Sequence, residues 1–393
     1  MEFAESHYYR HNARILIFLG QWPYQSSMWN RIRQFFIHLT IFSVISVQMI
    51  KMFVSWGNVD IMIECFTPVG VQVTAVIKSI NLMINQSKIR SITDHMQADW
   101  ATLKDENELT ILRKFAEEGR KMSVAYAFFL FGSLVIYLLV PLIPSILNVV
   151  LPLNDSRQRA YLYETEYFVD REAYFWWIVL HTYIGTILTI CTVVSVDAMF
   201  ATYVQHACGL LAIVSDNLEK TAGSINWAKF DPDVPLEEDE FYEQLKTCVR
   251  NHQEVTKLAI LIESCFSSAA LFQMVLDMVL VSVSLLQLLT KLGQYDQMYR
   301  IIQFNFAQLF HLFFNMWPGQ KLINESTIFS EAVYYSGWHG FSFRCRSLIK
   351  IIMMATARPL TISAFKFYEL SMENFGAMLQ TSLSYFTVLA SLR

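Results

Sequence analysis

The chain has 393 residues, of which 54% are hydrophobic, 15% aromatic and only 16% charged. Soluble domains carry roughly 25% charged residues, so this chain has too few charges to cover the outside of a soluble enzyme. The net charge of −4 provides no field that would attract nucleic acid. Gly (13) and Pro (9) are scarce, which favours long uninterrupted helices. The composition therefore predicts an all-α membrane protein.

The first fourteen residues are charged throughout and show no apolar core before a cleavage site, so we expect no cleaved signal peptide. Further along, several stretches contain the roughly 20 mostly apolar residues that a membrane-spanning helix needs. We predict seven spans, which are Gln34–Val54, Ile61–Ile84, Met122–Ile143, Tyr174–His206, Leu258–Leu289, Ile301–Trp317 and Met372–Leu392. The fourth and fifth spans are longer than a bilayer requires, so we expect each to continue into water as a helix. Asp197 is expected to mark the point where the fourth span leaves the membrane.

Basic residues flanking the spans predict the orientation, because Lys and Arg are retained on the cytoplasmic side. With seven spans, 21 of the 30 Lys and Arg residues fall on the side of the N-terminus and six on the other side. The N-terminus is therefore predicted inside and the C-terminus outside. The sequon at Asn154 agrees with this orientation, although Asn85 and Asn324 head sequons that it places inside.

Seven spans also suggest a G-protein-coupled receptor, but that class places its N-terminus outside. The tripeptide Asp170-Arg171-Glu172 resembles a motif of that class, yet it lies on the predicted external side. An ion-coupled transporter is disfavoured, because few ionisable residues lie inside spans and no repeated half is visible. Those few are Glu64, Lys78, Glu263 and Asp277.

Motifs for catalysis or metal binding are absent from the sequence. The six cysteines form no CxxC pair and the histidines His181 and His311 stand alone in their spans, so we expect no disulfide, no metal site and no cofactor. No nucleophile elbow, phosphate loop or HExxH motif is found, and we expect no enzyme. The acidic segment Asp231–Glu243 is predicted to be a solvated loop. The alternative is that its carboxylates raise the local concentration of cations near the inner mouth of a pore.

Aromatic and apolar residues in the outer halves of the helices, with a few polar groups among them, suit a small closed pocket for a volatile or sparingly soluble ligand. The alternative is an ordinary lipid-facing surface. The candidate pocket residues are Phe66, Val69, Gln72, Phe131, Val135, Ile136, Trp177, Leu180, His181, Ile302, Gln303 and Phe306.

The C-terminal quarter is the most specific part of the chain. An amphipathic stretch runs from Ser326 to Thr361. Within it, the apolar run Leu348–Ala357 is followed by Arg358-Pro359, and Pro359 is expected to end or kink the helix. On a helix of 3.6 residues per turn, Thr381, Tyr385, Val388 and Leu392 share one stripe, with Ser384 and Ser391 beside it. Such a stripe faces either lipid, the bundle or a pore.

This region resembles the insect odorant receptor family. The resemblance rests on Tyr335-x-x-Trp338, Arg358-Pro359-Leu360, the Phe375/Leu379 spacing and the terminal Ser384-Tyr385-Phe386-x-x-Leu389. A gustatory receptor, which ends differently, is the less favoured relative.

The resemblance implies a tetrameric, ligand-gated, non-selective cation channel in which the last helix lines the pore. Val388 and Leu392 match the gate, and Tyr335, Trp338, Arg344 and Arg358 fall in a cytoplasmic helical anchor. The expected organisation is a cytoplasmic segment 1–33, spans one to six with the odorant pocket at 34–318, an anchor at 319–370 and the pore helix at 371–393.

The partners that the resemblance implies are a small volatile odorant, permeating cations, membrane lipid and the odorant receptor co-receptor in a heterotetramer. The implied location is the plasma membrane of olfactory sensory neurons. The short connection between the fourth and fifth spans resembles a ligand-tuning subunit rather than the co-receptor, which carries a long insertion there.

Overall fold

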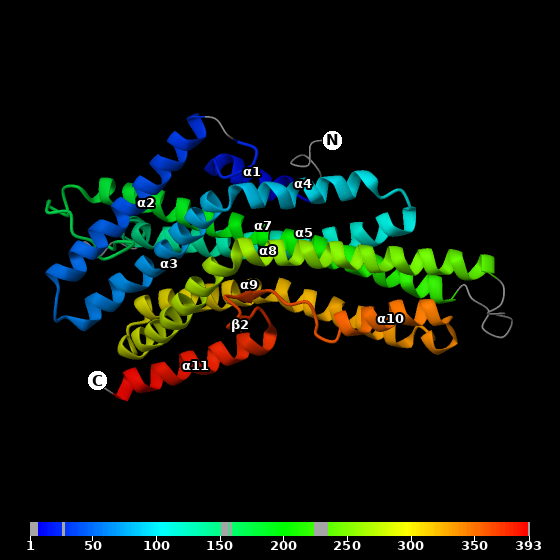
Figure 1. Ribbon diagram of the computed structural model, residues 1–393. Coiled ribbons are helices and arrows are strands. Elements are labelled where there is room, and N and C mark those ends of the chain that lie inside the picture. The colour runs from blue at the N-terminus through cyan, green and yellow to red at the C-terminus, as the bar shows by residue number, and fades with distance from the viewer. Residues whose placement is uncertain (1–6, 26–27, 151–156, 158, 224–234, 392–393) are drawn as a thin grey trace.

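The computed structural model describes residues 7–25, 28–150, 157, 159–223 and 235–391, and it is a bundle of long helices with one small hairpin (Figure 1). The α-helices are α1 (Arg10–Leu19), α2 (Met28–Val54), α3 (Val59–Ile84), α4 (Gln86–Thr102), α5 (Glu106–Leu139), α6 (Ile143–Val150), α7 (Phe175–Gly223), α8 (Pro235–Thr290), α9 (Tyr295–Tyr335), α10 (Phe343–Ala355) and α11 (Met372–Ser391). The short elements are the 3₁₀ turns η2 (Val140–Leu142) and η3 (Trp338–Gly340) and the antiparallel strands β1 (Ser363–Ala364) and β2 (Tyr368–Glu369). The predicted all-α class is confirmed.

The predicted spans coincide with helices throughout the described part of the chain. The fourth and fifth spans do continue as helices, in α7 with 49 residues and α8 with 56. Five helical segments among the described residues are apolar and long enough to cross a membrane: α2, α3, the run from α5 through α6, α7 and α8. The more polar α9 and α11 fall outside this group, so their crossing of the membrane stays a prediction.

Local sequence explains where several helices begin. Asn58 precedes α3 and its Oδ1 accepts a hydrogen bond from the Ile61 amide at 3.3 Å, while Asp105 accepts one from the Asn107 amide at 3.2 Å before α5. Both caps satisfy amides that have no partner within their own helix.

α7 is the central helix of the bundle and contacts α5, α9, α8 and α3. In its most apolar window 72% of the residues are buried, against 22% in α2 at the edge. Gly185 lets α2 approach closely, because a Cβ there would lie 2.6 Å from Cγ2 of Val44. The side chain of Asp197 is buried inside the bundle, and where the fourth span leaves the membrane stays a prediction.

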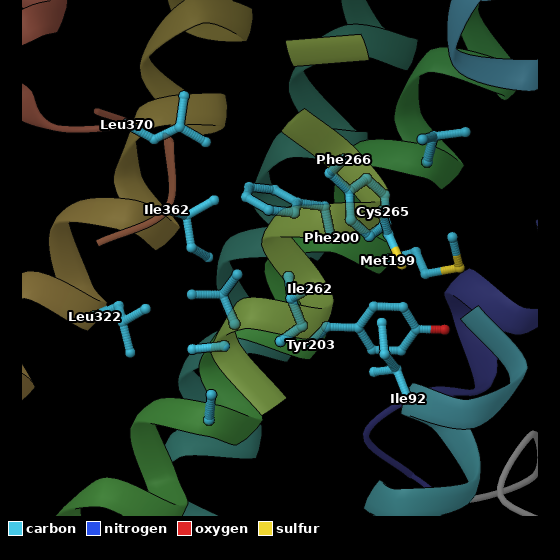
Figure 2. Close-up of a cluster of buried hydrophobic side chains, with 14 of the residues drawn as sticks. Ile92, Met199, Phe200, Tyr203, Ile262, Cys265, Phe266, Leu322, Ile362 and Leu370 are labelled. Carbon is cyan, nitrogen blue, oxygen red and sulfur yellow. The ribbon is translucent and has the colours of Figure 1, made fainter. Parts of the chain in front are cut away.

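The largest buried cluster joins α4, α7, α8 and α9 to the segment that precedes α11 (Figure 2). Figure 2 shows side chains from all of these elements, labelled Ile92, Met199, Phe200, Tyr203, Ile262, Cys265, Phe266, Leu322, Ile362 and Leu370. Because Leu370 is only two residues before α11, the start of the last helix is attached directly to the apolar core.

The connections fall at two ends of the bundle. The α2–α3 and α8–α9 turns and the end of α11 lie at the left in Figure 1, whereas the α4–α5 turn and α10 lie at the right. This alternation is what the predicted order of spans requires. Which end faces the cytoplasm stays a prediction from the basic residues.

The predicted anchor region, residues 319–370, contains the end of α9, η3, α10 and the hairpin of β1 and β2. α9 runs unbroken through Pro318 to Tyr335, so the predicted boundary between 318 and 319 falls inside one helix. The amphipathic stretch from Ser326 to Thr361 is two helices with η3 between them, because Gly337 adopts a left-handed conformation at φ 72°. α10 ends at Ala355, ahead of Pro359, as expected.

Candidate functional site

A cavity of about 570 Å³ lies among α3, α5, α7 and α9, and we call it the main cavity. A volume of this size is ordinary for a small-molecule pocket. The connection before α7 contributes residues 159–164 to its lining, so this connection covers one side of the space. Much of the remaining wall is apolar, including Val71, Leu130, Leu134, Ile190 and Phe304.

The covering connection is held by hydrogen bonds to three helices. The backbone oxygen of Leu162 accepts one from Tyr137 Oη of α5 at 3.0 Å and one from Arg300 Nη2 of α9 at 3.1 Å. Tyr163 Oη pairs with Thr186 Oγ1 of α7 at 2.8 Å. Burial raises the pKa of Tyr163, so this phenol remains neutral. The cover is therefore fixed at two consecutive residues.

Two of the candidate pocket residues, Gln72 and Gln303, line the main cavity. Gln303 Nε2 donates to the backbone oxygen of Ser133 at 2.6 Å, and Gln72 Oε1 accepts from Gln48 Nε2 at 3.2 Å. Each amide is thus oriented by a neighbouring helix. Within this apolar wall, the two amides supply polar groups that can orient a ligand.

The other ten candidates lie outside the lining of this cavity, and they are Phe66, Val69, Phe131, Val135, Ile136, Trp177, Leu180, His181, Ile302 and Phe306. Helix phase explains the division on α9, where Gln303, Phe304 and Ala307 face the cavity. Ile302 and Phe306 lie on the outer side, 38% and 65% exposed. His181 instead connects α2 to the covering connection, with Ser43 Oγ on one ring nitrogen and Tyr167 Oη on the other, both at 2.8 Å.

Charged residues at the cavity were not among the sequence candidates. Glu64 lines it and pairs with Lys291 of the α8–α9 turn at 2.7 Å. Arg300 also lines it, from the first turns of α9. A signal was available in the sequence, because Glu64 is one of the few ionisable residues inside a predicted span.

A second unpredicted feature is a network of buried polar side chains at the centre of the bundle. Lys78 of α3 pairs with Asp197 of α7, and Tyr126 Oη of α5 donates to Asp197 at 2.7 Å. The same hydroxyl lies 2.7 Å from His311 Nδ1 of α9. Gln273 of α8 contacts Nε2 of His311 at 3.1 Å. Five helices therefore meet through side chains that are far apart in the sequence.

α11 presents one face to the bundle and one face outward. It contacts α8 and α9, where Ser382 is buried and its backbone oxygen accepts from Ser282 Oγ at 3.0 Å. On the outer face, Tyr385 is 57% and Val388 54% exposed, and Ser384 and Ser391 are exposed as well. Thr381 lies at the border between the two faces. Leu392 lies outside the described residues.

The candidate anchor residues occupy different surroundings. Trp338 packs against a buried cluster that includes Phe329 and Ile349, and the Arg344 guanidinium lies 4.4 Å from the ring centroid of Tyr242. Tyr335 and Arg358 are exposed. The anchor thus combines internal packing with a surface that no other part of the described chain covers.

The fold and the main cavity define a multi-pass helical membrane protein with room for a small ligand. Comparison with known sequences makes the class specific: the profile described as "7tm Odorant receptor" matches residues 58–383. The chain belongs to this odorant receptor family, which is a family of receptors rather than of enzymes.

Individual relatives agree with this membership. Odorant receptor 13a of Drosophila melanogaster is 26% identical over 338 residues, which cover 80% of this chain and 76% of that protein. Odorant receptor Or2 of Anopheles gambiae is 23% identical over 388 residues, 96% of each chain. The odorant receptor coreceptor of Drosophila melanogaster is 26% identical over 152 residues, 38% of this chain and 31% of that protein.

A solved structure shares the fold. The olfactory receptor OR5 of Machilis hrabei, determined in complex with eugenol, superposes with a TM-score of 0.82 at 16% sequence identity, covering 98% of this chain and 99% of that chain. The resemblance found in the C-terminal quarter therefore extends over the whole helical bundle.

Proposed function

We propose that this protein is a subunit of an odorant-gated, non-selective cation channel. The family match over residues 58–383 carries the proposal and favours a channel over signalling through a G protein. The main cavity supports it further, because its volume and largely apolar wall suit a small volatile ligand. We infer that the odorant occupies this cavity, and that the candidate residues lining it, Gln72 and Gln303, contact the odorant.

We infer that the chain is the ligand-tuning subunit and assembles with the odorant receptor co-receptor into a heterotetramer. The extent of the two similarities supports this: Odorant receptor Or2 aligns over 96% of both chains, but the Drosophila coreceptor over only 38% of this one. The exposed residues of the anchor supply a surface for such an assembly. The corresponding location is the plasma membrane of olfactory sensory neurons.

We infer further that α11 lines the pore, with Val388 and Leu392 at the gate and Ser384, Tyr385 and Ser391 beside the ion path. The exposure of Tyr385 and Val388 in the single chain supports this, because a pore face would be left uncovered until subunits assemble. A ring of apolar side chains closes a pore by excluding water. The remaining candidates, including Phe131 and His181, would act by positioning helices around the cavity.

Co-expression with the co-receptor in oocytes tests the proposal. We expect odorant-evoked current that persists when G-protein signalling is blocked and disappears when either subunit is omitted. Current that requires G protein would refute the channel assignment. A tag added to the C-terminus of the protein tests the orientation, and we expect an antibody against the tag to label intact cells from outside.

A further inference from the structure

The main cavity contains one positive charge that has no ion-pair partner among the described residues. Four charged side chains line it, and three of them have ion-pair partners of opposite charge. The three pairs are Glu64–Lys291 at 2.7 Å, Arg159–Glu172 at 3.3 Å and Glu164–Arg171 at 3.6 Å. The fourth is Arg300, and no carboxylate of the described residues lies within 4.0 Å of its guanidinium.

The groups that contact Arg300 directly are neutral, and the Glu64 carboxylate, which acts on it from beyond ion-pair distance, is itself paired with Lys291. Arg300 Nη2 donates to the Leu162 backbone oxygen at 3.1 Å, and the guanidinium carbon lies 5.7 Å from the ring centroid of Tyr137. The phenol of Tyr161 supplies no negative charge either, because burial raises its pKa. A guanidinium held away from bulk water beside neutral groups costs free energy, and an anion in the cavity would offset that cost.

A purely structural role for Arg300 explains less. The hydrogen bond to Leu162 fastens the covering connection, but Tyr137 Oη already donates to the same oxygen at 3.0 Å. A neutral donor is therefore sufficient for that task. Holding the connection does not account for a permanent charge at the wall of the cavity.

We propose that the main cavity selects small carboxylic acids, bound as anions with the carboxylate at Arg300. A guanidinium presents parallel N–H groups that match the two oxygens of a carboxylate. The apolar wall formed by Leu130, Leu134 and Phe304 would hold the hydrocarbon or aryl part of the same molecule. This inference deepens the proposed function and rests on it for the gating response, but not for binding.

A matched set of ligands tests the selectivity. Phenylacetate, methyl phenylacetate and 2-phenylethanol share one aryl skeleton and differ in charge and in the oxygen acceptor. On heteromers with the co-receptor in oocytes, we expect phenylacetate to act at a concentration about ten-fold or more below its methyl ester, since hydrogen bonds between charged groups are the stronger ones. An ester that is as potent as the acid, or more potent, would overturn the proposal.

Variants separate the role of the Arg300 charge from the role of its hydrogen bond to the backbone oxygen of Leu162. We expect Arg300→Gln to abolish the preference for acid over ester, and Arg300→Lys to retain part of it. Tyr137→Phe is the matched control, because it removes the other donor to Leu162 while keeping the cation, and it should preserve the acid-to-ester ratio. Loss of that ratio in Tyr137→Phe but not in Arg300→Gln contradicts the assignment.

Binding is measured separately from gating, so that the two proposals fail in distinguishable ways. The purified full-length chain in detergent should show a higher unfolding temperature with phenylacetate than with the ester at equal concentration, since a ligand that binds only the folded state stabilises it. Stabilisation without any evoked current refutes the channel function alone. Current with neutral odorants but no stabilisation by phenylacetate refutes the carboxylate site alone.

Discussion

Lys78 of α3 and Asp197 of α7 form an ion pair in which the two side chains are only 3% and 4% exposed. Asp197 also accepts from Tyr126, which in turn contacts His311. The pair therefore joins the central helix to α3, α5 and α9. Charges of this kind are rare inside membrane proteins and are tolerated because they have partners.

Removing one member of this pair should destabilise the bundle. We expect Lys78→Met or Asp197→Asn to lower the free energy of unfolding by about 3–5 kcal/mol, because the remaining charge loses its buried partner. The double variant Lys78→Met/Asp197→Leu should recover much of this loss, since it leaves neither charge buried. Thermal unfolding of purified protein in detergent measures the effect. A double variant no more stable than the single ones would contradict this interpretation.

The contact between α9 and the segment before α11 predicts a sensitivity at Gly319. A Cβ at this position would lie 2.1 Å from the backbone oxygen of Leu370, so α9 or the segment must move. We expect Gly319→Ala to lower stability by about 1–3 kcal/mol, as overpacking does, and to change the ligand sensitivity of the channel. Gly376→Ala is the control, because nothing lies within 4 Å of its added Cβ. Equal effects from both substitutions would refute the role of this contact.

The two faces of α11 predict a difference in chemical accessibility. Cysteine at Ser384, on the outer face, should react with a water-soluble thiol reagent and alter the current. Cysteine at Ser382 should react at least about ten-fold more slowly, because that position is buried against α8. The native cysteines give little background, since five of the six are buried. Similar rates at both positions would place the pore face elsewhere.

The uncovered surface of α10 predicts an effect on assembly. Phe343 and Met354 are 78% and 79% exposed, on one side of the helix. We expect Phe343→Glu to reduce recovery of the co-receptor complex about ten-fold, which corresponds to 1.4 kcal/mol of lost association. Phe343→Leu keeps the surface apolar and should assemble normally. Co-purification from detergent extracts is the measurement, and an intact complex with Phe343→Glu would argue for a different interface.

Much of the fold was predictable because it depends on local composition. Apolar runs and scarce glycine indicate helices directly, and the predicted spans coincide with helices of the described chain, except that the third span runs from α5 through η2 to the start of α6. The continuation of α9 through Pro318 was not predictable in the same way. An interior proline removes one helix hydrogen bond and commonly kinks or ends the helix, so local sequence favours a break at this position.

The cavity was less predictable, because a lipid-facing wall and a ligand-facing wall use the same apolar residues. Gln303 and Phe306 are three positions apart on one helix, yet Gln303 lines the cavity and Phe306 faces outward. Ion pairs such as Glu64–Lys291 join positions far apart in the chain, so no local pattern signals them. A polar residue inside a predicted span, such as Gln72 or Glu64, indicates the cavity better than an apolar one does.

The burial of α7 has a consequence for how such receptors diversify. A substitution on α2, where most side chains lie at the edge of the bundle, needs only to remain compatible with lipid. A substitution on α7 must fit neighbours on several helices at once. Over evolutionary time we therefore expect the sequence of α2 to vary widely and that of α7 to change mainly through paired replacements. New ligand preferences would then arise from residues around α7 while α7 itself changes slowly.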